Sequence, residues 1–281
     1  MSYRWWSSCR SAIGRVRAVN EDTFLDLSEI GLWVVADGMG GHARGDVASQ
    51  MVVEAFEGMR RPASIDAFSA EVRERLHAAN RAIQEETRHQ GANQLMGSTV
   101  VVLIVHKRQW RCLWAGDSRA YLMRDGVLQQ ITRDHSLAQD MVDLGQLTPD
   151  EARNHVYANR ITRAVGAGPD LQVDERGAEL RDGDAILLCS DGLNKELSET
   201  EIADVLSSYD CDEASRELIE WSLERGGRDN VTVAVVRFEA NTGFSARSSD
   251  DTAVNHRLVH PGVIAGVGAT RRTLRRPHAG G

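Results

Sequence analysis

Short apolar runs that end in a carboxylate are the feature that most constrains how this chain can fold. The runs WVVADG and LLCSDG carry Asp37 and Asp191 at their ends, and neither is followed by sequence that continues a strand. A third run, CLWAGDSR, ends at Asp117, and Asp229 precedes the run VTVAVV with only Asn230 between them. Apolar runs of this length are typical of buried strands. We therefore expect four carboxylates at the ends of buried strands.

The strands and helices are expected to come in groups. Buried strands are predicted over Leu32–Ala36, Thr99–Val105, Trp110–Ala115, Ala120–Met123, Ala185–Cys189 and Val231–Phe238. Apolar residues three and four positions apart predict two pairs of helices, over Ala43–Met59, Ile65–Arg88, Glu199–Leu206 and Asp212–Arg225. Grouped strands and paired helices do not fit a regular βαβ alternation. They favour an α+β fold with largely antiparallel sheets.

The chain is expected to divide into one domain, residues 1–240, and a C-terminal tail, residues 241–281. Within the domain, the segment 136–160 is polar and broken by Gly145 and Pro149, so we expect a helical excursion from the sheets. The tail contains six Arg and two Asp, is rich in Gly, Ser and Thr, and shows no sustained periodicity. It is therefore expected to be basic and mostly disordered.

The body of the chain is acidic. A formal net charge of -8 for the whole chain and about +4 in the tail leave about -12 elsewhere. Such a body argues against nucleic-acid binding and suits divalent cations. No run approaches the roughly 20 apolar residues that cross a bilayer, and the N-terminus lacks the apolar stretch of a signal peptide. We therefore expect a cytoplasmic protein with neither membrane nor nucleic acid as a partner.

Carboxylates that converge at one edge of a core need compensation. Like charges repel strongly in a low dielectric, so such a cluster requires cations or retained protons. Oxygen ligands suit hard ions such as Mg²⁺ or Mn²⁺. The alternative is a set of unrelated turn and cap aspartates, because Asp-Gly commonly forms a tight turn. That alternative is expected to hold for Asp125-Gly126, between AYLM and VLQQI, and for Asp182-Gly183. Spacing alone leaves both interpretations open for the other aspartates.

The N-terminal segment adds a cation to these carboxylates. Arg17 lies close in sequence to Asn20, Glu21 and Asp22. An arginine can hold a phosphate through two parallel hydrogen bonds. The alternative is an ordinary surface salt bridge.

Nine segments together resemble the PP2C-type, metal-dependent Ser/Thr protein phosphatases. They are GRVRAVNED (14–22), VVADGMGGHARG (34–45), GST (97–99), GDSRAYL (116–122), ITRDHSL (131–137), MVDLGQLTPDEA (141–152), NRITRAVG (159–166), LLCSDGL (187–193) and GGRDNVTV (226–233). Each is weak alone, but all occur in the family's order and cover roughly residues 10–238. The length and the DGMGGH spelling resemble the compact bacterial branch.

The resemblance implies a four-layer αββα fold, in which a central antiparallel β-sandwich is flanked on both sides by antiparallel helix pairs. Residues 136–160 then resemble a flap beside the cleft. The implied activity is hydrolysis of phosphoserine and phosphothreonine in proteins by attack of a metal-bridging hydroxide. The implied cofactors are two Mn²⁺ or Mg²⁺ ions, with a third in some members. The implied partners are phosphorylated proteins, a cognate bacterial Ser/Thr kinase and its targets.

Site roles follow from the resemblance residue by residue. The residues implied to contact metal are Glu21, Asp37, Gly38 (through its carbonyl), Asp117, Asp191 and Asp229. Asp37 would bridge two ions, and Asp117 with Asp191 resembles the third, weaker site. Arg17 resembles the phosphate clamp, and Arg17, Asp37, Asp191 and Asp229 form the implied catalytic set.

Supporting roles are implied for Asp22, which resembles a carboxylate that holds Arg17 in place, and for Asn230, which resembles a residue beside the metals. The chain departs from the family where a DGHxG spelling supplies a His directly after Asp-Gly as a general acid. Here that position is Met39. His42 is a candidate acid instead, with a structural role as the alternative.

Two other functions are compatible with these residues. One is a catalytically inactive scaffold of this family that binds phosphoproteins, although that would require a lost metal ligand. The other is hydrolysis of small phosphorylated metabolites, since a fold does not determine its substrate.

Overall fold

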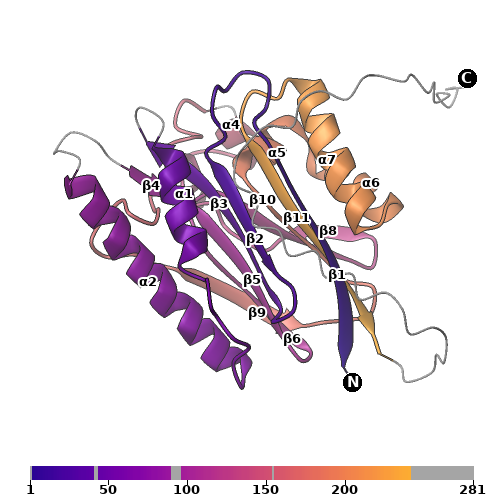
Figure 1. Ribbon diagram of the computed structural model, residues 1–281. Helices are drawn as coiled ribbons and strands as arrows, with labels where there is room; N and C mark the ends of the chain where they lie inside the picture. The colour runs from indigo at the N-terminus through magenta and orange to yellow at the C-terminus, as the bar shows by residue number, and fades with distance from the viewer. Residues whose placement is uncertain (1, 41–43, 90–95, 154, 242–281) are drawn as a thin grey trace, which may run out of the picture. The chain divides into compact units, whose positions relative to one another are not determined.

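The structure is a computed structural model that describes residues 2–40, 44–89, 96–153 and 155–241 (Figure 1). Its strands are β1 (Tyr3–Ala12), β2 (Asp22–Leu27), β3 (Leu32–Gly40), β4 (Met96–Ser98), β5 (Val100–His106), β6 (Gln109–Ala115), β7 (Arg119–Arg124), β8 (Val127–Gln130), β9 (Asp174–Glu179), β10 (Ala185–Cys189) and β11 (Val231–Ala240). Its helices are α1 (Gly45–Glu54), α2 (Ile65–His89), α3 (Leu137–Asp143), α4 (Pro149–Arg153), α5 (Asp191–Glu196), α6 (Glu199–Ser208) and α7 (Cys211–Arg225). Apart from Asn241, the predicted tail lies outside the described residues.

Two antiparallel sheets form the centre of the domain. One has the strand order β1-β11-β10-β7-β8, and the other has β2-β3-β5-β6-β9 with β4 paired to β3. Side chains such as Trp33 and Leu103 from one sheet pack against Leu188 and Val236 from the other. The prediction of an α+β fold with antiparallel sheets is confirmed.

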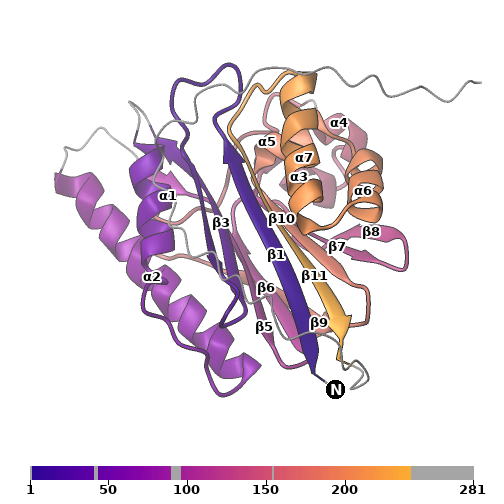
Figure 2. The ribbon, with the colours of Figure 1, turned by 45° about the vertical axis from the view of Figure 1, so that its right-hand side comes forward.

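Helices cover the outer face of each sheet (Figures 1 and 2). Phe56 of the turn after α1 and Phe68 of α2 pack in one cluster with Val34 of β3. On the other sheet, Leu218 of α7 packs with Val235 of β11. Alternate residues of a strand point to opposite faces, so a strand covered on both faces is apolar throughout. This explains why the central strands read as continuous apolar runs.

The longest helix, α2, contains 25 residues and alternates a buried stripe with many charged side chains. Within the described part of the chain, no helix has the combination of length and apolar character required to cross a membrane.

Most predicted boundaries agree with the structure. All six predicted strands are present, and Ala185–Cys189 coincides with β10. Asp125-Gly126 forms the expected turn of the β7–β8 hairpin, with φ of 51° and 79°. The helix predicted over Ala43–Met59 is too long, because α1 ends at Glu54 and the chain then turns through Gly58.

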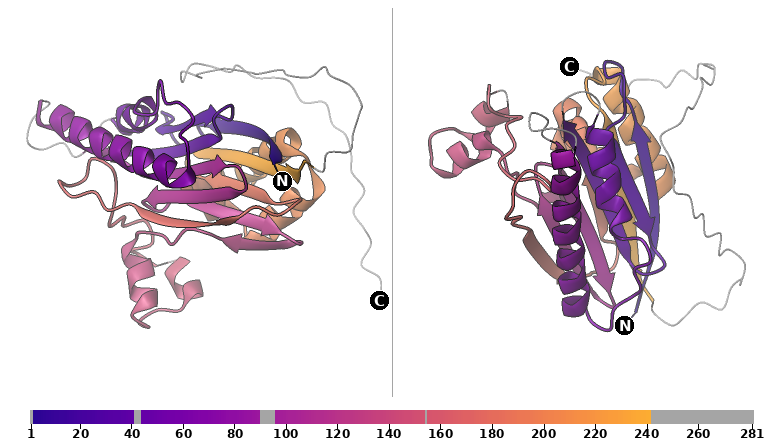
Figure 3. Two further views of the ribbon diagram at one scale, coloured as in Figure 1. Left: turned by 90° about the horizontal axis from the view of Figure 1, so that it is seen from below. Right: turned by 60° about the vertical axis from the view of Figure 1, so that its left-hand side comes forward.

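A helical excursion is present where the sequence predicts it. Helices α3 and α4, pink in the left view of Figure 3, project away from the sheets. Ser136 caps α3 by accepting a hydrogen bond from the Gln139 N–H (3.2 Å). The excursion is closed at its base, where the Leu137 N–H donates to the Arg160 carbonyl (2.9 Å). We call residues 136–160 the flap.

Ser198→Ala is expected to lower the free energy of unfolding by about 1 kcal/mol, because Ser198 and Glu201 form a capping box at the start of α6. In a domain of this size that corresponds to a fall of about 2–4 °C in Tm, measurable by circular dichroism. Ser208→Ala, at the other end of α6, is the matched control, since the Ser208 hydroxyl only bonds back to the Asp204 carbonyl. Equal Tm values for the two variants would contradict the assigned cap.

Candidate active site

Asp37 lies on β3 at the end of the sheet where several chain segments meet. The strand does not stop at this residue, as the sequence had suggested, but continues to Gly40 by pairing with β4. The Thr99 N–H donates to the Asp37 carbonyl (2.8 Å), and the Asp37 N–H donates to Thr99 Oγ1 (3.2 Å). The Ser98 hydroxyl also donates to the Asp37 carbonyl (3.1 Å). The GST segment therefore fixes the backbone that presents the Asp37 carboxylate.

The residue after Asp37 has to be glycine because the start of α1 packs against it. A β-carbon on Gly38 would lie 1.9 Å from the Gly45 carbonyl oxygen, far inside van der Waals contact. The Gly38 N–H donates to the Glu21 carbonyl (3.0 Å), and Glu21 Oε1 accepts from the Gly45 N–H (3.0 Å). Glu21, the last residue of the loop that precedes β2, therefore links this loop to the N-terminus of α1.

Asp191 and Asp229 are brought together by a similarly close backbone contact. Asp191 begins α5, and a β-carbon on Gly192 would lie 2.0 Å from the Asn230 carbonyl oxygen. Asn230 in turn holds the loop that carries Arg17. Its side chain accepts from the Glu21 N–H (2.9 Å) and donates to the carbonyls of Ile13 (2.8 Å) and Val19 (3.0 Å).

Arg17 contacts Asp229 rather than Asp22. Its Nε lies 2.9 Å from Asp229 Oδ1, and about half of the Arg17 side chain is exposed. The prediction that Asp22 holds Arg17 is not met in the structure. Pairing of β2 with β3 places Asp22 opposite Asp37, where its Oδ2 accepts from the Ser190 hydroxyl (2.7 Å). Asp22 is thus a buried member of the carboxylate cluster.

Asp117 follows β6 in a turn that the base of the flap supports. The Gly116 N–H donates to His135 Nδ1 (3.1 Å), and the His135 ring stacks on Trp114. The Ser118 and Thr99 hydroxyls are 2.7 Å apart, which ties this turn to the GST segment beside Asp37. Asp117 itself is buried.

The carboxylates lie close enough to shift one another's pKa. Burial, and then repulsion by neighbours that include Asp22, Asp191 and Asp117, raises the pKa of Asp37 well above its ordinary value. Burial and Asp191 do the same to the pKa of Asp117. Burial raises the pKa of Asp22 to about 7, although hydrogen bonds partly oppose the change. Against its burial, Lys195 and Arg17 keep the pKa of Asp229 below its ordinary value.

The donor set fits hard divalent cations. Three carboxylate oxygens, Oδ1 of Asp22, Asp117 and Asp191, are buried and have no hydrogen-bond partner among the described residues. A buried anionic oxygen without a partner is costly, and a cation would compensate it. If all are ionised, the six carboxylates of the cluster carry six negative charges, of which its two cationic side chains offset two in the structure. The six carboxylates are those of Glu21, Asp22, Asp37, Asp117, Asp191 and Asp229.

Lys195 is a member of this cluster that the sequence reasoning missed. Its Nζ lies 2.5 Å from Asp191 Oδ2 and 3.1 Å from Asp229 Oδ2. Among the described residues, no three His, Cys, Asp or Glu side chains meet in the geometry of a metal site, and Lys195 and Arg17 contact two of the expected ligands instead. Asp191 and Lys195 are four residues apart, so a helix predicted over these residues would have indicated the contact.

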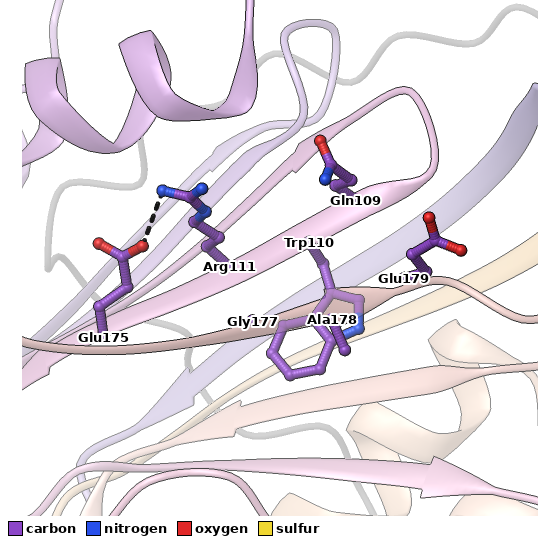
Figure 4. A pocket seen from close by; sticks show the side chains of 7 residues that line it. All are labelled: Gln109, Trp110, Arg111, Glu175, Gly177, Ala178 and Glu179. Carbon is purple, nitrogen blue, oxygen red and sulfur yellow. Dashed lines mark ion pairs between the residues drawn. The ribbon is translucent and has the colours of Figure 1, made fainter.

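A pocket lies apart from this cluster, and one predicted site residue falls outside the described part of the chain. His42 is outside the described residues, so its predicted role as a general acid stays a prediction. A pocket of about 360 Å³ lies over β6 and β9 (Figure 4). Strand β9 is the edge strand on the side of its sheet opposite to β2. The wall of the pocket includes the ion pair of Arg111 with Glu175 (2.9 Å). None of the predicted site residues lines it, so it does not belong to the candidate active site.

Comparison with known proteins gives the family. The family model for protein phosphatase 2C matches residues 14–227. The serine/threonine protein phosphatase PstP of Mycobacterium tuberculosis is 38% identical over 228 residues, which span 81% of this chain and 44% of that relative. The chain thus matches less than half the length of PstP.

Two solved structures are similar along nearly their whole length. PppA, described as a key regulatory component of T6SS in Pseudomonas aeruginosa, is 43% identical with a TM-score of 0.78, over 85% of this chain and 98% of that chain. The catalytic domain of PstP in complex with two manganese ions is 36% identical with a TM-score of 0.74, over 85% of this chain and 100% of that chain. With the match to the family model, these likenesses establish that the chain belongs to the protein phosphatase 2C family of metal-dependent serine/threonine phosphatases.

Proposed function

We propose that this chain hydrolyses phosphoserine and phosphothreonine in proteins with the help of two Mn²⁺ or Mg²⁺ ions, and a third at Asp117 and Asp191. The observation that carries the proposal is a buried cluster of carboxylates, with unpartnered oxygens, beside a half-exposed arginine. The residues that would hold the ions are Glu21, Asp37, Gly38 through its carbonyl, Asp117, Asp191 and Asp229. Bound divalent cations would lower the pKa of the water bound to them, so that it can lose a proton at neutral pH. They would also offset negative charge on the phosphoryl group.

Arg17 would bind and orient the substrate phosphate. Its guanidinium is held at Asp229 through Nε, and the side chain is half exposed. Phosphate oxygens can therefore accept two parallel hydrogen bonds from its outer nitrogens. Asn230 would keep the Arg17 loop in register with Glu21, and Asp22 would support the cluster through its bond to Ser190.

A protein substrate is favoured over a small metabolite by the flap. Leu144 and Val156 expose 72% and 84% of their surfaces there, and Tyr157 is also exposed. Apolar side chains on an extension of the fold suit contact with a polypeptide on either side of the phosphorylated residue. We also propose a four-layer αββα fold, with one domain over residues 1–240 and a tail over 241–281. The proposed location is the cytoplasm, and the proposed partner is a cognate Ser/Thr kinase.

The test is hydrolysis of p-nitrophenyl phosphate and of a phosphothreonine peptide with Mn²⁺ and with excess EDTA. We expect activity only with the metal, and Arg17→Ala should lower kcat/KM about 100-fold by removing a donor to the phosphate. Arg216→Ala, on the exposed face of α7, is the matched control and should keep wild-type kinetics. Full activity in EDTA would refute the proposal. Phosphopeptide binding without turnover would favour the inactive scaffold, and faster turnover of sugar phosphates than of peptides would favour the metabolite phosphatase.

A further inference from the structure

One lysine bridges two of the carboxylates to which the proposed function assigns metal. Lys195 is one of only two lysines in the sequence, the other being Lys107. It belongs to α5, the helix that Asp191 begins, and its ammonium contacts Asp191 Oδ2 (2.5 Å) and Asp229 Oδ2 (3.1 Å). Its side chain is 28% exposed. The ammonium therefore joins carboxylates from two separate chain segments.

These contacts occupy the oxygens that a cation would need. Asp229 Oδ2 accepts from Lys195, while Asp229 Oδ1 accepts from Arg17 Nε (2.9 Å) and from the Asn230 N–H (3.0 Å). Both Asp229 oxygens are thus engaged by protein donors. Asp191 keeps one buried oxygen, Oδ1, without a hydrogen-bond partner in the described chain.

An ammonium and a divalent cation cannot both sit closely against the same carboxylates, because they repel each other in a buried site. The Lys195 backbone is fixed, since α5 packs through Gly192 onto Asn230. Its four-carbon stem is flexible and partly exposed, so the ammonium can leave toward solvent while the helix stays in place. Loading of the site by a cation therefore requires Lys195 to give up its two contacts.

We propose that Lys195 is a displaceable internal counter-ion that competes with divalent cations for Asp191 and Asp229, and so sets the metal concentration at which this site is filled. The inference rests on the proposed function, because it takes these aspartates as metal ligands. It assigns to Lys195 a role in metal affinity and not in bond breaking.

The first measurement is Mg²⁺ and Mn²⁺ binding by calorimetry to the chelator-treated full chain. Lys195→Met should bind the cation at Asp191 and Asp229 about tenfold more tightly than the wild type, because the competitor is gone. Lys195→Arg keeps the charge and should stay within about threefold of the wild type. Lys107→Met, at a turn between β5 and β6, is the matched control and should not change the affinity. Circular dichroism establishes that each variant is folded.

The second measurement observes the displacement directly. In ¹⁵N-lysine-labelled protein only two side-chain Nζ signals can arise, and Lys107→Met assigns them. Addition of Mg²⁺ should shift or broaden the Lys195 signal and leave that of Lys107 in place.

The outcomes separate this inference from the proposed function. If neither the wild type nor Lys195→Met binds Mg²⁺ or Mn²⁺, the proposed metal centre itself is wrong. Suppose that the wild type binds the cation and Asp37→Asn does not, so that the proposed metal centre stands. If Lys195→Met then binds with an affinity within twofold of the wild type, or more weakly, only the competition by Lys195 is refuted. An unchanged Lys195 Nζ signal at saturating Mg²⁺ would refute it as well.

Discussion

Asp37→Asn is expected to lower kcat for a phosphothreonine peptide by about three orders of magnitude at saturating Mn²⁺. The change keeps the shape of the side chain but removes the charge proposed to bridge two ions. Loss of about 4 kcal/mol of transition-state stabilisation by the metal centre corresponds to that factor. Asp125→Asn is the matched control, because Asp125-Gly126 is also an Asp-Gly pair but forms an exposed hairpin turn. It should retain the wild-type kcat.

The same variant should be more stable than the wild type in EDTA. Burial and repulsion from neighbouring aspartates raise the pKa of Asp37, which means that its charged form is disfavoured in the folded protein. A neutral Asn removes this repulsion, so Tm should rise by about 2–4 °C for each 1 kcal/mol gained. Loss of activity with a lower Tm would indicate misfolding, and a kcat within tenfold of the wild type would exclude Asp37 from the metal centre.

The sequence predicted six strands that are buried over most of their length and missed several that are more exposed. The runs at β5 and β10 are buried at every position, so apolar composition alone identified them. Strand β9, with the sequence DERGAE, is an exposed edge strand and carries no such signal. Strand β1 is partly exposed along its length and was not among the predicted strands. It pairs with β11 over ten residues, a partner more than 200 residues away that no local pattern could specify.

The same limit applies to the site. Carboxylates at the ends of apolar runs indicated Asp37, Asp117 and Asp191, because a strand end places a side chain at the edge of a core. The inward position of Asp22 depends on the register of β2 against β3, and β2 was not predicted. Lys195 was missed because Asp191-Gly192 was not expected to begin a helix, and only a helix turns a residue four positions later back onto Asp191.

The second large effect concerns pH. In EDTA, the difference in free energy of unfolding between Asp22→Asn and the wild type is expected to grow in favour of the variant as pH increases from about 4.5 to 7.5. The difference grows because the wild type loses stability over this range. The folded protein raises the pKa of Asp22 to about 7, because the side chain is buried and lies beside other carboxylates. The unfolded chain loses the same proton near pH 4. Between these values the native state binds more protons, so wild-type stability falls as pH rises.

Asn at position 22 has no proton to lose and can still accept the hydrogen bond from the Ser190 hydroxyl. The advantage of the variant should therefore rise from about 1 kcal/mol at pH 4.5 toward an upper limit of about 4 kcal/mol at pH 7.5. Urea unfolding at four pH values measures this difference and cancels the titration of histidines, which both proteins share. Asp125→Asn removes the same charge from an exposed turn and should show no such trend. A difference between Asp22→Asn and the wild type that is constant with pH would mean that Asp22 is ionised throughout, and that cations of the protein such as Lys195 already balance the cluster.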